Sequence, residues 1–221
     1  MTAVLFDLDG TLMDTPQVIV RSLRHILGED SHIHDDTDLA RHVGRPLDMI
    51  MTSLFPKAPA ETIEEKKHDF RESFRAATVP DARGLVFANV RGLLAHLENK
   101  GIPAAIVTSK VTASALELLE AGHIRSTFDA VIGHDMALAG KPAPDLALLA
   151  ATQLHAEPSE CLVVGDSPDD MRMGVAARMH TIGVTWGVGD HATLQSSGAS
   201  TIAHTVEDLQ SSILAVAGRN S

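Results

Sequence analysis

The sequence predicts an α/β fold in which a doubly wound parallel sheet carries an inserted α-helical cap subdomain. Short apolar runs recur along the chain with amphipathic segments between them, which is typical of parallel strands joined by helices. The runs are continuously apolar, as expected for strands covered on both faces. One early segment, from about Asp14 to Arg83, contains no convincing strand and far exceeds the roughly 2–6 residues of a usual βα loop.

The first element, Ala3–Phe6, is an apolar run of the kind that forms a buried strand. Two groups of apolar residues in the segment after it have helical spacing: Val18, Ile19, Leu23, Ile26 and Leu27, then Ile63, Phe70 and Phe74. Proline and glycine flank this segment on both sides, as they often do at hinges. We therefore expect residues 1–13 and 84–221 to form the core and residues 14–83 to form the helical cap.

The remaining elements alternate between strand and helix. Four further apolar runs are predicted as strands, namely Ala104–Val107, Ala130–Ile132, Cys161–Val164 and Thr181–Val184. The predicted helices are Val90–Lys100, Thr112–Ala121, Pro144–Leu154 and Pro168–Ala177. Gly101 and Gly122 follow the first two of these helices, as glycine often does at a helix C-terminus.

Composition and charge narrow the class of protein. The chain has 221 residues, 44% of them hydrophobic and 21% charged, which is typical of a soluble globular protein. Its net charge of −11 disfavours nucleic acid and anionic membranes as partners, and no apolar run is long enough to span a bilayer. The single Cys161 excludes an internal disulfide framework and is predicted to be an inert, buried thiol. Because the N-terminus has no signal-peptide pattern, we expect a cytoplasmic location.

Two carboxylates, Asp7 and Asp9, follow the first predicted strand. In an open α/β sheet, ligands bind at the carboxyl ends of the strands. Residues two apart in an extended chain point to the same side, so these carboxylates should lie close together and resist joint ionisation. A carboxylate nucleophile beside a carboxylic acid suits phosphoryl transfer. The alternative is that Asp9 and Gly10 merely form a turn.

A second pair of acids, Asp166 and Asp170, follows the predicted strand Cys161–Val164. Carboxylates at this edge of the sheet are the ligands that Mg²⁺ prefers, together with water and phosphate oxygens. The alternative is helix capping, because Asp166 or Ser167 before a proline is a good helix start.

Two weaker signals lie in other loops. The hydroxyls of Thr108 and Ser109 follow a predicted strand and precede a helix, where backbone N–H groups can bind an anion. A plain N-cap is the alternative, and it is favoured on local evidence. Lys141, between glycine and proline, would neutralise a phosphate or carboxylates, although a lone loop lysine is usually only solvated.

Together these features occur in one order along nearly the whole chain. They resemble the four motifs of the haloacid dehalogenase-like superfamily, in its phosphoglycolate-phosphatase-like branch with a helical C1-type cap. The matching segments are Asp7–Leu12 for the first motif, Thr108–Lys110 for the second, Lys141 for the third and Gly165–Asp170 for the fourth. The resemblance implies a sheet whose first strand is central, with the second and fourth strands beside it.

The resemblance also implies a role for each site residue. Asp7 would attack phosphorus and form an aspartyl phosphate, and Asp9 would act as general acid and then as general base. The implied ligands of Mg²⁺ are Asp7, the backbone carbonyl of Asp9, Asp166 and Asp170, the last directly or through water. Thr108 and Lys141 would hold phosphoryl oxygens. Charge counting also favours the metal, because one ammonium cannot balance the carboxylates and a phosphate dianion.

We therefore expect a Mg²⁺-dependent phosphatase of a small phosphorylated metabolite, as a monomer or homodimer. Three alternatives stay open: a sugar-phosphate mutase of the β-phosphoglucomutase type, a pyrophosphatase and a catalytically silent phosphate-binding protein. Such mutases carry an early cap histidine, which Thr15–Val20 lacks, and His25 is the nearest candidate.

In the cap, Arg45 either recognises an anionic group or is simply exposed. His32 and His34 fit no zinc pattern and are interpreted as part of a solvated loop.

Overall fold

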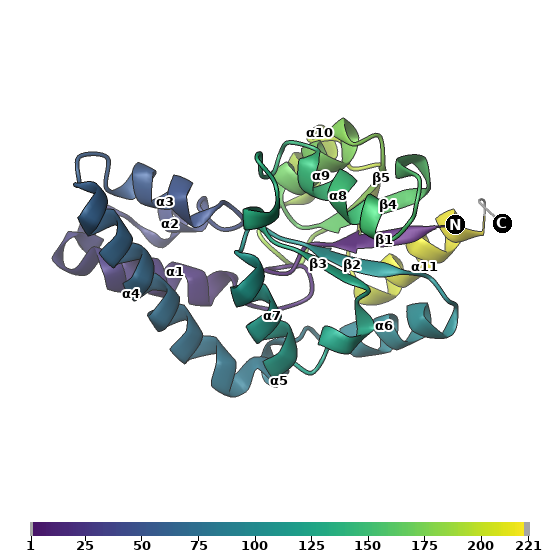
Figure 1. Ribbon diagram of the computed structural model, residues 1–221, viewed down its shortest axis with the longest axis horizontal. Coiled ribbons are helices and arrows are strands. Elements are labelled where there is room, and N and C mark those ends of the chain that lie inside the picture. Colours follow the sequence, from purple (N-terminus) through teal and green to yellow (C-terminus); the bar gives the residue numbers. More distant parts are fainter. Residues whose placement is uncertain (1, 219–221) are drawn as a thin grey trace.

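The computed structural model describes residues 2–218, and its centre is a six-stranded parallel sheet (Figure 1). The strands are β1 Ala3–Phe6, β2 Ala104–Val107, β3 Ala130–Ile132, β4 Cys161–Gly165, β5 His180–Val184 and β6 Thr201–Ala203. Their order is β3-β2-β1-β4-β5-β6, so β1 lies between β2 and β4. Leu5 of β1 is in register with Ala105 of β2 and Val163 of β4. The predicted fold class and the central place of the first strand are confirmed.

Helices cover both faces of this sheet (Figure 1). They are α6 Val90–Asn99, α7 Thr112–Ala121, α8 Asp145–Gln153, α9 Pro168–Ala176, α10 His191–Ser196 and α11 Val206–Ala217. Side chains of β1 alternate between the faces, as the pleat of a strand requires. Ala3 and Leu5 pack with residues of α8 and α9, whereas Val4 and Phe6 belong to the apolar cluster that includes α6, α7 and α11. All four β1 side chains are buried, which explains the continuous apolar run.

The five predicted strands and four predicted core helices all occur, with ends that differ by no more than about one residue. The sixth strand and the last two helices were not predicted. Strand β6 has only three residues, of which Ala203 alone is buried, so it gives almost no apolar signal. Helix α11 does carry a local signal, because Thr205 accepts a hydrogen bond from the N–H of Asp208 at 3.1 Å in a capping box.

The chain between β1 and β2 begins with four helices that form the left-hand part of Figure 1. They are α1 Pro16–Leu27, α2 Asp36–Ala40, α3 Leu47–Leu54 and α4 Ala60–Thr78, with a short 3₁₀ turn at Gly28–Ile33. A second 3₁₀ turn, Val79–Asp81, leads to the short helix α5 Ala82–Leu85, which packs against α7. Helix α1 packs against α4 and α2, and α3 packs against α4. The spaced apolar residues of α1, including Val18 and Leu23, share one buried cluster with Phe70 and Phe74 of α4. The predicted helical insertion is therefore present.

The outgoing and returning chains of the insertion lie side by side. The N–H of Asp14 donates to the carbonyl of Leu85 at 2.7 Å, and the N–H of Phe87 donates to that of Leu12 at 3.1 Å. An antiparallel bridge joins Met13 to Val86 between these two bonds. The helical segment is thus connected to the core through two adjacent extended segments, and we retain residues 14–83 as the proposed limits of the cap.

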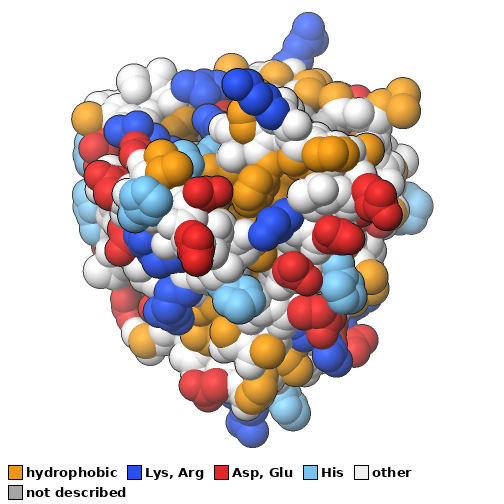
Figure 2. Space-filling view, turned by 90° about the vertical axis from the view of Figure 1, so that its left-hand side faces the viewer, with side chains coloured by type: hydrophobic (Ala, Val, Ile, Leu, Met, Phe, Trp, Pro, Cys, Tyr) orange, Lys and Arg blue, Asp and Glu red, His pale blue; other side chains and the backbone are white. Residues whose placement is uncertain are grey.

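The face at the cap end shows acidic, basic, histidine and hydrophobic side chains in a mixed pattern (Figure 2). Among the described residues visible there, basic side chains do not form a continuous surface. Within residues 2–218, none of the helices combines the length and the apolar character needed to cross a membrane. Cys161 is a free thiol buried at the start of β4.

Candidate active site

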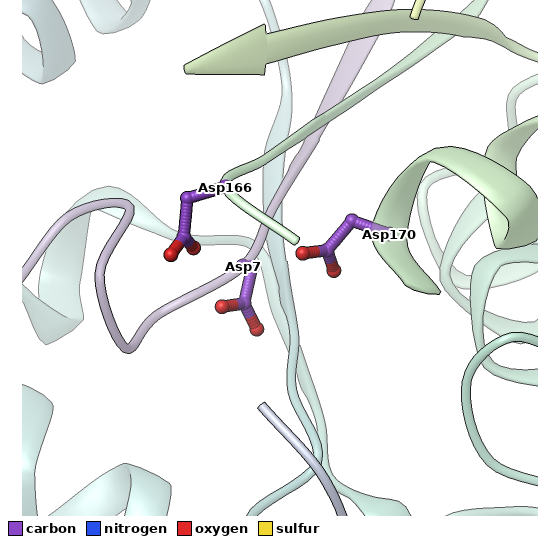
Figure 3. Close-up of side chains that lie close together, drawn as sticks. All are labelled: Asp7, Asp166 and Asp170. Atoms are coloured by element: carbon purple, nitrogen blue, oxygen red, sulfur yellow. The ribbon is translucent and has the colours of Figure 1, made fainter. Parts of the chain in front are cut away.

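Three buried carboxylates meet at the carboxyl end of the sheet. Asp7 directly follows β1, Asp166 directly follows β4, and Asp170 lies in the first turn of α9. One oxygen atom from each carboxylate lies within 4.8 Å of the other two, and Figure 3 shows the side chains pointing toward a common space. Adjacent parallel strands bring their carboxyl ends to one edge, which explains why acids 159 residues apart (166 − 7) become neighbours.

Lys141 supplies positive charge inside this group of acids. Its ammonium nitrogen lies 2.6 Å from Oδ1 of Asp7 and 2.5 Å from Oδ1 of Asp170, and its side chain is 2% exposed. Burial lowers the pKa of Lys141, but the charges of Asp170 and Asp7 raise it more, so the net pKa lies above the ordinary value. The lysine stays protonated and orients both carboxylates. The loop of Lys141, one of the two weaker signals in the sequence, therefore reaches the centre of the site.

Asp170 is both a helix-capping residue and a site residue. The Oγ of Ser167 accepts from the N–H of Asp170 at 3.2 Å, and the N–H of Ser167 donates to Oδ2 of Asp170 at 3.1 Å. This capping box matches the alternative interpretation of the fourth motif. The other oxygen of Asp170 faces Lys141, so the helix start fixes a carboxylate that also belongs to the acidic group.

Two hydrogen-bond donors hold the carboxylate of Asp166, and two glycines leave the space that it occupies. Thr11 Oγ1 donates to its Oδ1 at 2.7 Å, and the N–H of Val188 donates to its Oδ2 at 2.8 Å. A Cβ atom at Gly10 or Gly187 would lie 2.3 Å or 2.1 Å from that Oδ2, so only glycine fits at either position. These supports were not predicted, and the glycine-rich stretch after Trp186 was the signal available for them.

Burial of like charges changes the ionisation of the group. Burial raises the pKa of Asp7 well above its ordinary value, and the opposing charge of Lys141 does not reverse the shift. Burial, followed by the charge of Asp170, raises the pKa of Asp166 to about 7. Three carboxylates thus face one ammonium, and their hard oxygen atoms are the donor type that Mg²⁺ prefers. By charge and donor chemistry, Asp7, Asp166 and Asp170 fit a divalent cation.

Asp9 lies beside this group, and residues from two different places hold its carboxylate. Thr15 Oγ1, just before α1, donates to Oδ1 at 2.5 Å, and Lys110 Nζ lies 3.0 Å from Oδ2. The same ammonium lies 3.9 Å from the ring centroid of Phe74 in α4. Neither Thr15 nor Lys110 was predicted as a site residue, although Lys110 stands in the second motif. Asp9 is thereby linked to both the start and the long helix of the insertion.

Thr108 and Ser109 lie in the loop after β2, as predicted. Thr108 is buried, and its Oγ1 accepts a hydrogen bond from the N–H of Lys110 at 3.2 Å. Among the described residues, no partner reaches the buried Oγ of Ser109. Neither hydroxyl caps α7, because Asp135 Oδ1 accepts from the N–H of Thr112 at 2.6 Å. The N-cap alternative is wrong for this loop, and Ser109 retains a free hydrogen-bonding group.

Arg45 lines a cavity of about 260 Å³ that also contacts Asp9 and Lys110. Its side chain is exposed, and no carboxylate within the described residues forms an ion pair with it.

His32 and His34 lie outside the one group of potential metal ligands found in residues 2–218. The neighbouring Asp35 instead caps α2, accepting from the N–H of Asp38 at 2.8 Å.

Comparison with known proteins identifies the family. The family model described as haloacid dehalogenase-like hydrolase matches residues 4–184. The chain belongs to the haloacid dehalogenase-like hydrolase family. This confirms the resemblance inferred from the four motifs, and the helical insertion between β1 and β2 agrees with a family core that carries a C1-type cap.

Relatives within this hydrolase family extend over most of the chain. One, named "Probable phosphatase IndB", from Dickeya dadantii, is 37% identical over 208 residues, or 93% of this chain and 90% of that protein. The pyrophosphatase PpaX of Oceanobacillus iheyensis is 30% identical over 93% of this chain and 94% of its own length. A crystal structure titled as a predicted phosphatase from Clostridium acetobutylicum has a TM-score of 0.81 and 29% identity, covering 96% of this chain and 98% of that one.

Proposed function

We propose that the chain is a Mg²⁺-dependent phosphatase that hydrolyses a small phosphomonoester through an aspartyl phosphate on Asp7. One observation carries the proposal: the Asp7 carboxylate lies among Asp166, Asp170 and Lys141, with Asp9 two residues further along the chain. Phosphatase names among the relatives of this hydrolase family support the same reaction class.

The first step forms the covalent intermediate. A carboxylate oxygen of Asp7 attacks phosphorus while the bond between phosphorus and the ester oxygen breaks. Asp9 donates its proton to the departing oxygen, so the product leaves as a neutral alcohol. Thr15 and Lys110 hold the two oxygens of Asp9 and thereby fix the direction from which the proton is delivered.

The second step regenerates the enzyme. A water molecule attacks phosphorus of the aspartyl phosphate, and Asp9, now a carboxylate, takes the proton from that water. The bond between phosphorus and the Asp7 oxygen breaks, which releases inorganic phosphate and restores both side chains. The same residue serves as acid and then as base because each step reverses its protonation state.

Phosphate and metal contacts follow from the same loops. We assign phosphoryl oxygens to Lys141, Thr108 and Ser109, the last of which has a hydroxyl without a described partner. The proposed ligands of Mg²⁺ are Asp7, the backbone carbonyl of Asp9, Asp166 and Asp170. When bound, Mg²⁺ would supply positive charge that favours the ionised carboxylates and offsets the phosphate dianion. Arg45 remains a proposed contact for a polar end of the substrate at the exposed edge of the cavity.

Replacing the nucleophile tests this assignment. We expect Asp7→Asn to lose phosphate release in a metabolite-panel assay with Mg²⁺, because an amide cannot form the aspartyl phosphate. The matched control is Asp169→Asn, since Asp169 lies in the same motif but pairs with Arg172 at 3.1 Å, away from the acidic group. Excess EDTA should abolish activity, and added Mg²⁺ should restore it. Wild-type rates in Asp7→Asn, or full activity in EDTA, would refute the mechanism.

A pyrophosphatase is the second candidate, and the PpaX relative favours it. Pyrophosphate would use the same Asp7 and Asp9, with phosphate as the leaving group. The mutase alternative gains no support from the cap, because His25 is exposed on α1 and does not line the cavity beside Asp9. Comparing phosphate release from pyrophosphate and from sugar monophosphates separates the three reactions.

A further inference from the structure

A cavity of about 260 Å³ lies between the helical insertion and the core, beside the proposed acid Asp9. Its walls come from α1, α3 and α4 on one side and from α7 and the loop after β2 on the other. The leaving group of a phosphoester held at Asp7 must lie near Asp9, since Asp9 protonates it. The chemistry of this cavity therefore selects the alcohol part of the substrate.

The deep lining of the cavity is apolar. Apart from Asp9, the lining residues that are buried are Ile19, Ile50, Phe70, Phe74 and Leu118. They come from both the insertion and the core, so the apolar wall continues across the interface. A charged leaving group placed against these five side chains would lose hydration without gaining a partner from them. Within residues 2–218, the unpaired polar atoms of the lining, His42 Nδ1, Ser109 Oγ and His134 Nδ1, belong to partly buried residues, so they can bind a polar linker but do not interrupt the apolar wall.

The charged residues that line the cavity are either paired or exposed. Several of them are already paired: Lys110 with Asp9 at 3.0 Å, Arg75 with Glu117 at 2.6 Å, and Asp48 with Lys67 at 2.5 Å. Among the described residues, Arg45 and Arg71 line the cavity without a carboxylate partner, but both side chains are exposed. Exposed charges of this kind are screened by water, so they act at the open edge of the cavity, where Arg45 is the proposed contact for a polar end of the substrate, and not at the apolar wall.

We propose that the substrate's alcohol carries a compact apolar body, such as a phenyl ring or a branched alkyl group, joined to the phosphate oxygen by a short linker. The proposal rests on the phosphatase function proposed above. A cavity of about 150 Å³ lined by similar side chains accommodates benzene, so the larger volume here admits a ring with its linker. The reaction converts the ester and water into the free alcohol and inorganic phosphate.

A matched series of ligands tests the proposal without turnover. The Asp7→Asn chain with Mg²⁺ is titrated calorimetrically with ethyl, 3-methylbutyl and 2-phenylethyl phosphate, which share a primary alkyl oxygen and differ in apolar size. We expect 2-phenylethyl phosphate to bind about 10- to 100-fold more tightly than ethyl phosphate. Equal affinities, or tightest binding of 2-phosphoglycolate or pyrophosphate, would overturn it. Phosphate release by the wild-type chain is measured in parallel, so that a failure of catalysis is distinguished from a failure of recognition.

Two leucines of α3 provide a matched pair of variants. Leu47 and Leu54 are both half-buried, but only Leu47 lines the cavity. We expect Leu47→Ala to weaken binding of 2-phenylethyl phosphate about threefold to tenfold, with a smaller effect on ethyl phosphate. Leu54→Ala should leave both affinities unchanged, with circular dichroism verifying the fold of each variant. Equal losses in the two variants would assign the effect to general packing of α3 and would contradict the proposed pocket.

Discussion

Gly187 lies against the carboxylate of Asp166, where the site leaves no space for a side chain. We expect Gly187→Ala to displace Asp166, because the added Cβ would lie 2.1 Å from Oδ2. Phosphatase activity at limiting Mg²⁺ should fall about 10- to 100-fold, as is typical when a residue supporting a metal ligand is changed. The measurement is the Mg²⁺ dependence of phosphate release.

Gly92→Ala is the control for that substitution. Gly92 lies in α6, and a Cβ there would meet nothing within 4 Å. Alanine is the better helix former, so this variant should keep full activity and gain about 0.5–1 kcal/mol of stability. An active Gly187→Ala enzyme with an unchanged Mg²⁺ requirement would show that Asp166 does not need its present position.

Among single residues of the site, the sequence predicts some and misses others, for a physical reason. Asp7 and Asp166 end apolar strands, so their meeting follows from the rule that ligands bind at the carboxyl edge of a parallel sheet. Lys110 follows β2, which pairs with β1, so the same rule brings it beside Asp9, but a loop lysine carries no sequence signal that its ammonium will meet a carboxylate. The contact of Thr15 with Asp9 depends on how the chain turns between β1 and α1, which no local pattern in a single sequence contains.

Strand β4 places its one cysteine where solvent does not reach. Burial, with the charge of Glu160 adding to it, raises the pKa of the Cys161 thiol to about 11. At pH 8 only about one thiol in a thousand is then ionised, and thiolate is the reactive form. We expect no reaction with a thiol reagent such as DTNB in the folded enzyme and stoichiometric reaction in guanidinium chloride. Rapid labelling of the folded chain would show that the start of β4 opens readily.

Elements differ in how well the sequence specifies them. Strands β1 to β5 were predicted because each is buried along nearly its whole length and reads as an apolar run. Strand β6 lies at the sheet edge with only Ala203 buried, so its pairing with β5, not its composition, makes it a strand. The short α5 was missed for a similar reason, since Ala82 is its only buried residue.

The whole molecule has a net charge of −11, and three of its carboxylates are buried together around one lysine. A cation that binds only the folded chain stabilises it by about 2.7 kcal/mol at a concentration 100 times the Kd. We expect Mg²⁺ to raise the Tm in a thermal-shift assay, relative to NaCl of equal ionic strength. Asp166→Asn should lose this rise, while Asp169→Asn should keep it. A wild-type Tm that is the same with and without Mg²⁺ would contradict the metal site.

The pH dependence of that assay has a definite sign. Because the folded pKa of Asp166 is about 7, above its ordinary value of 3.8, the metal-free folded chain keeps a proton that the unfolded chain releases. Metal-free stability should therefore decline as pH rises from about 4 to 7. The increase in Tm caused by Mg²⁺ should grow over the same interval, because a larger fraction of Asp166 is already ionised and the metal displaces fewer protons when it binds. A Mg²⁺ effect that shrinks between pH 5 and 8 would be inconsistent with this site.

The paired backbone segments between the insertion and the core have one further consequence. A body attached by a single linker can both swing and rotate about that linker. Here the hydrogen bonds from Asp14 to Leu85 and from Phe87 to Leu12 bind two connectors into one narrow ribbon. We expect two connectors held together in this way to restrict rotation of the helical part more than one free linker would. This favours a single placement of the helical part, the one in which Phe74 lies against the Lys110 ammonium and Thr15 donates to Asp9.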